Sequence, residues 1–209
     1  MSRRQIKSLA SSNSSCRGEA PRVFKTVDDI VDDYIKRYRH RAVEELREYS
    51  QLSDLNEVVK RAGLAECLNG KRHDHQRRIP AQALKEAARA LSAKISQLKA
   101  CRSFHDLFTV IEQTIHSRKG TPGIKHIGDL AVYDTALRIG SYLGSEPQHV
   151  YLHAGTLEGA HALGLDCRQG KIVPTDLRKP FQRLKPREAE DCLCIYKSDF
   201  RRLSQRTSR

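Results

Sequence analysis

The sequence contains no tryptophan, a single methionine and few aromatic residues, which make up 6% of its 209 residues. Proteins that bind single-stranded nucleic acid commonly stack bases on exposed aromatic rings, so this mode of binding is not indicated. No apolar run approaches the roughly 18 residues that a membrane span requires. We therefore expect a chain that does not cross a membrane.

Several catalytic motifs are also missing. The sequence has no Gly-x-x-x-x-Gly-Lys-Ser/Thr loop, no Gly-x-Ser-x-Gly elbow and no His-Glu-x-x-His helix. The six cysteines are scattered, and the one close pair, Cys192 and Cys194, lacks a second pair at zinc-finger spacing. We expect reduced thiols in a cytoplasmic protein, with no cofactor and no metal.

What the sequence has is positive charge, +13 in total, concentrated in three places. Residues 1–25 carry six Lys and Arg against one acid, residues 71–102 carry nine against two, and residues 178–209 carry ten against four. Residues 103–177 are slightly acidic, with six against eight. This distribution indicates a polyanionic partner, either nucleic acid or an acidic protein surface.

Helical periodicity dominates wherever the sequence is periodic, which predicts an all-α fold. We expect a single globular bundle of seven or eight helices over residues 26–203, between a disordered basic tail (1–25) and a basic end (204–209). The expected helices are 27–49, 53–68, 80–100, 104–117, 128–144, 156–163 and 186–203, with an eighth left open within 170–185 and an extended piece at 149–155.

The stretch "IKHIGDLAVYDTALRIGSYLG", residues 124–144, is the most regular passage. On a helix its apolar residues cover about half of the circumference, and a polar face with Asp134 and Arg138 lies opposite. These two are spaced four apart with the acid first, which favours an ion pair between them. The pattern therefore predicts an amphipathic helix that packs against the core.

The residues in front of that helix are less ordinary. "GIKHIGDL" places Gly123 and Gly128 five residues apart at a junction between helices, with Lys125 between them. This turn resembles the helix-hairpin-helix DNA-binding motif, whose glycines let backbone amides approach a phosphate. Downstream, "VYLHAGTLEGAHALGL" is similar to the segment that follows the motif in helix-hairpin-helix DNA glycosylases.

The resemblance covers residues 124–165, and it has clear departures. Tyr151 stands where the glycosylases have a catalytic aspartate, the hairpin is several residues longer than theirs, and the cysteine quartet of the iron-sulfur members is missing. The resemblance therefore implies a relative of that fold that does not catalyse the reaction. The passage is also similar to a widespread uncharacterised bacterial family, which implies no activity.

A second candidate is the loop "NGKRHDHQRRIP" at 69–80, which leads into the helix expected from Pro80. Ile79, the expected N-cap, offers no side-chain acceptor to the first-turn amides, so a phosphate could bind them. We expect phosphate contacts from the six basic and histidine side chains of this loop, the alternative being a solvated loop: Lys71, Arg72, His73, His75, Arg77 and Arg78.

Two further hypotheses concern histidines. His73-x-His75 has no third and fourth ligand at motif spacing, so we expect no metal there. Tyr151, His153 and Asp134 could instead surround a pocket and supply acid-base chemistry, although such residues more often pack in a core. The leading expectation is a non-catalytic nucleic-acid-binding protein; the alternatives are a helical module that docks an acidic partner, and an enzyme using these three residues.

Overall fold

The computed structural model describes residues 22–116 and 123–207. In this part of the chain the protein is mostly helical, with ten α-helices and one pair of two-residue strands, which confirms the expected all-α class. The α-helices are α1 (Val27–Arg37), α2 (Arg39–Ser50), α3 (Leu55–Leu64), α4 (Ala81–Ser92), α5 (Ile95–Lys99), α6 (Phe104–Ile115), α7 (Asp129–Leu143), α8 (Ala154–Ala162), α9 (Pro186–Ile195) and α10 (Lys197–Thr207).

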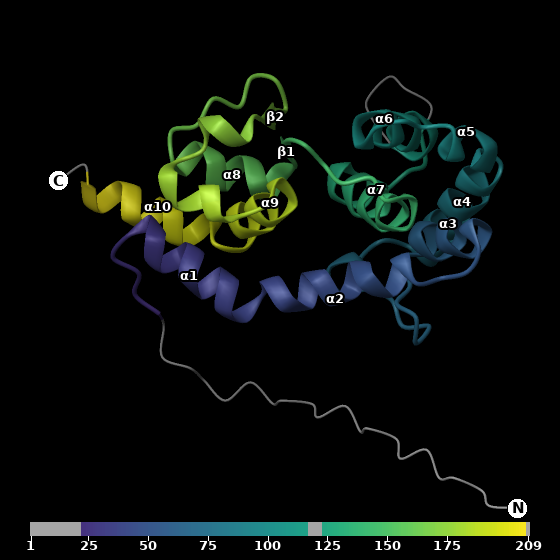
Figure 1. Cartoon of the computed structure of the whole chain (residues 1–209), viewed down its shortest axis with the longest axis horizontal. Helices are drawn as coiled ribbons and strands as arrows, with labels where there is room; N and C mark the ends of the chain where they lie inside the picture. The colour runs from purple at the N-terminus through teal and green to yellow at the C-terminus, as the bar shows by residue number, and fades with distance from the viewer. Residues whose placement is uncertain (1–21, 117–122, 208–209) are drawn as a thin grey trace, which may run out of the picture.

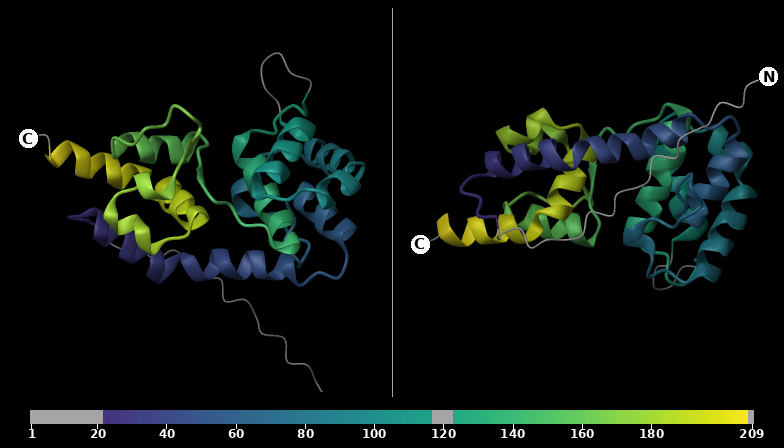
Figure 2. Two further views of the ribbon diagram at one scale, coloured as in Figure 1. Left: turned by 45° about the horizontal axis from the view of Figure 1, so that its top comes forward. Right: turned by 90° about the horizontal axis from the view of Figure 1, so that it is seen from below.

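The elements form two lobes (Figure 1). Helices α3 to α7 make one lobe from the middle of the chain, which we call the middle lobe. Helices α1 and α8 to α10 make the other, the terminal lobe, and α2 runs alongside both as a bridge. The two lobes are also separate in the two further views of Figure 2. The chain thus starts in the terminal lobe, builds the middle lobe and returns.

Each lobe buries its own hydrophobic cluster. The middle cluster includes Val58, Leu91 and Ile139, and the terminal cluster includes Ile30 and Phe200, all fully buried. Burial of apolar side chains is the main favourable term in folding, so each cluster stabilises its own lobe. The expected single bundle therefore has two cores.

Three helices begin at capping residues, within two residues of their expected starts at 27, 53 and 104. Thr26 and Asp29 form a reciprocal capping box at α1, and Ser103 and Asp106 form another at α6. Asp54 accepts a hydrogen bond from a first-turn amide of α3. These caps confirm the predicted starts of three helices.

Three expected helices are each divided in two, which accounts for ten helices where seven or eight are expected. The breaks fall at Tyr38, at Lys94 and at Tyr196. At the first, α1 packs in the terminal cluster and α2 adds Tyr49 to the middle cluster, so the two halves serve different cores. At the last, the Tyr196 hydroxyl donates a hydrogen bond of 2.6 Å to Asp33 of α1.

The segments around α8 are mostly irregular. Strands β1 (Val150–Tyr151) and β2 (Lys171–Ile172) pair antiparallel, with Val150 opposite Ile172. Residues 174–183 hold only two short 3₁₀ turns, η2 (Pro174–Asp176) and η3 (Lys179–Arg183), so no α-helix forms in 170–185. None of the helices in residues 22–116 and 123–207 has the length and hydrophobicity to cross a membrane.

Candidate nucleic-acid interface and the polar seam between the lobes

The basic loop 71–78 is an ordered segment held by backbone hydrogen bonds. Helix α3 ends at Leu64, earlier than expected, because Ala65 turns the chain with a left-handed backbone (φ 55°). Gly70 adopts φ 75°, which only glycine adopts readily, and it closes a tight turn in which the Cys67 amide donates to the Lys71 carbonyl. The 3₁₀ turn η1 (Asp74–Gln76) then leads to α4.

The side chains of this loop divide between surface and interior. Lys71, Arg77 and Arg78 are exposed, and Arg77 pairs with Asp74 at 2.6 Å. Arg72 instead donates to the backbone carbonyl of Ile79 at 2.9 Å. Three of the six expected phosphate contacts are therefore exposed at the surface, and one of these three, Arg77, is engaged in an ion pair.

The two histidines of the loop both contact other parts of the protein. His73 is buried, and that burial, followed by the charge of Arg138, lowers its pKa to about 3. It is therefore uncharged at neutral pH and presents almost no surface to a phosphate. His75 is 47% exposed but pairs with Asp134 on α7 at 2.7 Å. The loop thus anchors itself on α7 through its histidines.

The turn in front of α7 is the second expected interface. Gly123 and Lys125 are exposed, and the buried Ile127 fixes the turn on the middle cluster. Its ends are held together by a contact of 2.9 Å between Nε2 of His116, just after α6, and a carboxylate oxygen of Asp129, the first residue of α7. Most of the polar segment "RKGTPG", residues 118–122, lies outside the described residues.

Helices α4 and α7 both begin without a side-chain cap. Pro80 is the N-cap of α4 and Gly128 is the N-cap of α7, and neither provides a side-chain acceptor. The first-turn amides of both helices therefore have no acceptor within the described side chains at the cap. A helix N-terminus of this kind favours an anion, both through its amides and through the helix dipole.

Helix α7 itself is buried on both faces, which the amphipathic pattern does not predict. Arg138, expected on a solvent-facing polar side, is 1% exposed. Its guanidinium donates to Glu45 of α2 at 3.1 Å and to the side-chain oxygen of Gln76 at 3.1 Å. Gln76 in turn donates to Asp134 at 2.8 Å. The expected Asp134–Arg138 pair is thus replaced by a network that ties α7 to α2 and to the loop.

The terminal lobe contains a second buried cluster of polar side chains. His153 hydrogen bonds with Glu190 of α9, and the Thr156 hydroxyl donates to Glu190 at 2.8 Å. Burial alone lowers the pKa of His153, but hydrogen bonds to Cys194 and Glu190 raise it to about 10. His153 is therefore protonated at neutral pH. We call the two networks together the polar seam.

Tyr151 and His153 line a cleft of about 240 Å³ between α6, α7 and the two strands, together with Phe108 and Tyr133. The Tyr151 hydroxyl bonds to His105 at 3.2 Å, and burial raises its pKa to about 12. Asp134 does not line this cleft; it faces a separate cavity of about 120 Å³. The three residues of the enzymatic hypothesis therefore do not surround one pocket.

The smaller cavity contains a residue that sequence reasoning missed. Asp191 of α9 is largely buried there, and its burial, reinforced by the charge of Glu190, raises its pKa to about 7. A carboxyl group with such a pKa can donate or accept a proton at neutral pH. In the sequence Asp191 sits among other charged residues of a helix, and no local pattern marks it.

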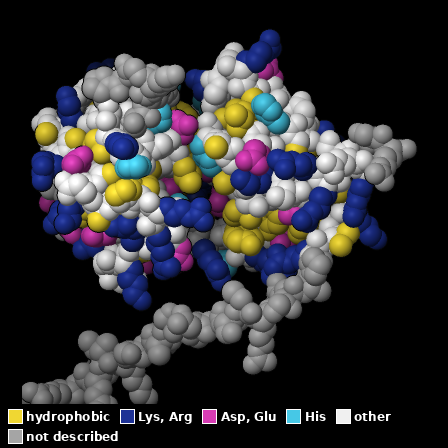
Figure 3. Space-filling view, turned by 180° about the vertical axis from the view of Figure 1, so that it is seen from behind, with side chains coloured by type: hydrophobic (Ala, Val, Ile, Leu, Met, Phe, Trp, Pro, Cys, Tyr) yellow, Lys and Arg dark blue, Asp and Glu magenta, His cyan; other side chains and the backbone are white. Residues whose placement is uncertain are grey.

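The described residues offer no metal centre: no three His, Cys, Asp or Glu side chains come together as ligands. The five cysteines within the described ranges form no disulfide. On the face turned away in Figure 1, Lys and Arg side chains lie on both sides of the furrow between the lobes (Figure 3). Comparisons with protein-family models, curated proteins and solved structures yield no match.

Proposed function

We propose that this protein binds nucleic acid through the phosphate backbone and does not catalyse a reaction on it. The observation that carries the proposal is that α4 and α7 each begin without a side-chain cap, directly after an exposed basic segment. Arg77 and Arg78 precede α4, and Lys125 precedes α7. Amides and basic side chains at one helix start are the donors that phosphate groups accept.

The two helix starts are connected by the fold. His75 and Gln76 of the basic loop both contact Asp134 of α7. Asp134 lies five residues after the first residue of α7, which corresponds to about 7.5 Å along the helix axis. We infer that the loop and the turn act as one phosphate-binding surface, in which α6, the connection and α7 resemble a helix-hairpin-helix element.

The overall charge supports the same proposal. A net charge of +13 attracts a polyanion at long range and speeds its encounter. Binding of this kind depends strongly on salt and little on base sequence, because phosphate contacts position a protein without reading bases. We accordingly propose a cytoplasmic protein that has weak sequence preference.

The test measures binding of a fluorescent duplex DNA by anisotropy at several salt concentrations. The double variant Arg77→Ala/Arg78→Ala should bind more weakly, and its slope of log affinity against log salt should fall by about 2. The control Arg47→Ala/Arg168→Ala removes the same charge from exposed positions outside the surface. Equal effects of the two variants would show that only net charge matters, and an unchanged slope would exclude the loop.

A further inference from the structure

The smaller cavity of the polar seam lies where α1, α2, η1, α7 and α9 meet. Its volume is about 120 Å³, which is enough to hold several water molecules. This is room for a small polar head group with a short stem. The charged and phenolic groups that face the cavity are Tyr34, Glu45, His75, Asp134, Arg187, Glu190 and Asp191.

The lining is rich in carboxylates, but three of the four are already paired. Glu45 accepts from Arg138, Asp134 from His75, and Glu190 from His153. The fourth, Asp191, has no ion pair within the described residues. Arg187 is the permanent cation of the lining, and its buried Nε has no hydrogen-bond partner within the described residues. The cavity therefore presents one carboxyl group that has no ion pair, with the Tyr34 hydroxyl as its neighbour, in largely acidic surroundings.

An independent feature points into the same cavity. The Tyr34 side chain is fully buried, and its hydroxyl lies beside the Asp191 carboxyl group without a partner at full hydrogen-bond geometry within the described residues. Burial raises the pKa of Tyr34 above its ordinary value, and the charge of Asp191 and its interaction with the hydroxyl add to this effect. Buried hydroxyl groups are nearly always hydrogen-bonded, because leaving one unpaired costs about 1 to 3 kcal/mol. With Asp191 as its one polar neighbour, the hydroxyl oxygen can still accept a hydrogen bond from a group in the cavity.

We propose that this cavity binds a primary alkylammonium group, held by the Asp191 carboxylate and the Tyr34 hydroxyl oxygen. An ammonium group offers three N–H donors and no acceptor, which suits a carboxylate without an ion pair beside a hydroxyl oxygen that can accept a hydrogen bond. A metal ion fits less well, because no three ligands converge within the described residues. An anion fits less well, because four carboxyl groups and one arginine, Arg187, face the cavity.

Binding of the cation is coupled to the proton of Asp191. Because the free carboxyl has a pKa of about 7, it is about one-tenth ionised at pH 6 and about nine-tenths ionised at pH 8. The ammonium group binds the ionised form. Its affinity should therefore rise about tenfold between pH 6 and pH 8, a range in which an alkylamine stays protonated.

The alkylammonium group has two sources, a free diamine or a lysine of a partner protein. Calorimetric titration of the full chain with 1,4-diaminobutane and with N-acetyl-lysine methylamide distinguishes them, and 1,4-butanediol serves as the uncharged control. Saturable one-to-one binding of the diamine alone assigns a free amine, and binding of the lysine amide assigns a protein lysine. Failure of both to bind at pH 8 would overturn the proposal.

Variants decide whether binding occurs in this cavity. Asp191→Asn should reduce affinity at least tenfold and abolish its pH dependence, and Tyr34→Phe should reduce it several-fold. Asp166→Asn, which removes an exposed carboxylate elsewhere, should change nothing. Unchanged affinity in both cavity variants would contradict the assignment, and Tyr34→Phe decides alone if Asp191→Asn does not fold. Both cavity variants should retain the salt slope for DNA, so this proposal and the proposed function fail separately.

Discussion

His75 and Asp134 lie 59 residues apart in the chain, yet their side chains meet at 2.7 Å. The contact joins the basic loop to the second turn of α7, and Gln76 reinforces it from the neighbouring position. The loop is thereby held on the helix whose N-terminus is the other part of the proposed interface.

This pair should make stability depend on pH. The hydrogen bond to Asp134 raises the pKa of His75 in the folded state, against the opposing effect of burial. A raised histidine pKa contributes stability that is fully present below about pH 6.5 and is lost as the pH rises through the folded value. Urea unfolding of His75→Gln should therefore show a larger loss at pH 5.5 than at pH 9, by about 1 kcal/mol or less because His75 is half exposed.

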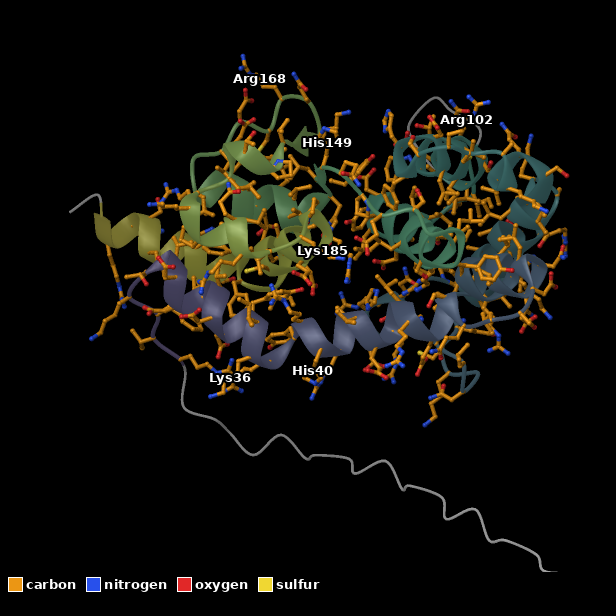
Figure 4. All side chains as sticks on the ribbon, viewed as in Figure 1. Lys36, His40, Arg102, His149, Arg168 and Lys185 are labelled. Carbon is orange, nitrogen blue, oxygen red and sulfur yellow. The ribbon has the colours of Figure 1, made fainter. Side chains whose placement is uncertain are left out.

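The control for this experiment is His40→Gln. His40 is exposed on α2 and points away from the body of the protein (Figure 4). Its replacement should lower stability little, and equally at both pH values. A pH-independent loss in His75→Gln would show that the pair contributes packing rather than charge.

Arg138 should contribute strongly to the free energy of unfolding. It is 1% exposed and donates hydrogen bonds to both Glu45 and Gln76. Arg138→Met therefore leaves a carboxylate and an amide oxygen without their donor. We expect the free energy of unfolding to fall by about 2 to 3 kcal/mol, below the full cost for a buried pair because Glu45 is one-third exposed. Arg61→Met breaks a more exposed pair with Glu57 and should cost below about 1 kcal/mol. Similar losses of stability in Arg138→Met and Arg61→Met would show that the buried network of Arg138 stabilises the fold no more than an exposed ion pair does.

Two buried threonines provide a matched pair for the second network. The Thr156 hydroxyl donates to the buried carboxylate of Glu190, whereas the Thr135 hydroxyl donates to the Ala131 carbonyl of its own helix. Thr156→Val should cost about 1 to 3 kcal/mol, because it removes a donor from a buried charge. Thr135→Val should cost clearly less, because that carbonyl lies within the helix ladder. Thermal unfolding of both variants ranks them, and the reverse order contradicts this account.

The expected helix boundaries at 27, 104, 144 and 163 lie within one residue of the observed ones, because such boundaries depend on neighbouring residues. The capping boxes at Thr26 and Ser103 and the left-handed glycines Gly144 and Gly164 end or start helices through contacts within a few residues. The breaks at Tyr38 and Tyr196 are different. Each break depends on which elements of the folded protein the two halves of the helix pack against. Helical periodicity continues across both positions, so the sequence pattern does not indicate a break.

The polar seam could not be predicted for a related reason. The helical pattern places Arg138 on the solvent-facing side of α7. Its burial was not predictable from that pattern, because it is caused by contacts with α2 and the loop, which are distant in sequence. In the sequence His73 belongs to a basic loop, yet burial lowers its pKa and leaves the side chain neutral. Charge counted along the chain locates Arg77 and Arg78 correctly at the surface, but it does not reveal which neighbours turn inward.

The central claim is that phosphate groups meet the uncapped starts of α4 and α7. Backbone amide NMR of the uniformly labelled chain during titration with a short duplex DNA tests it most directly. The largest shift changes should fall at residues 81–83 and 129–131, whose amides precede the first hydrogen-bonded turn of each helix. Changes confined to α8 and α9, with none at these six positions, would contradict the account.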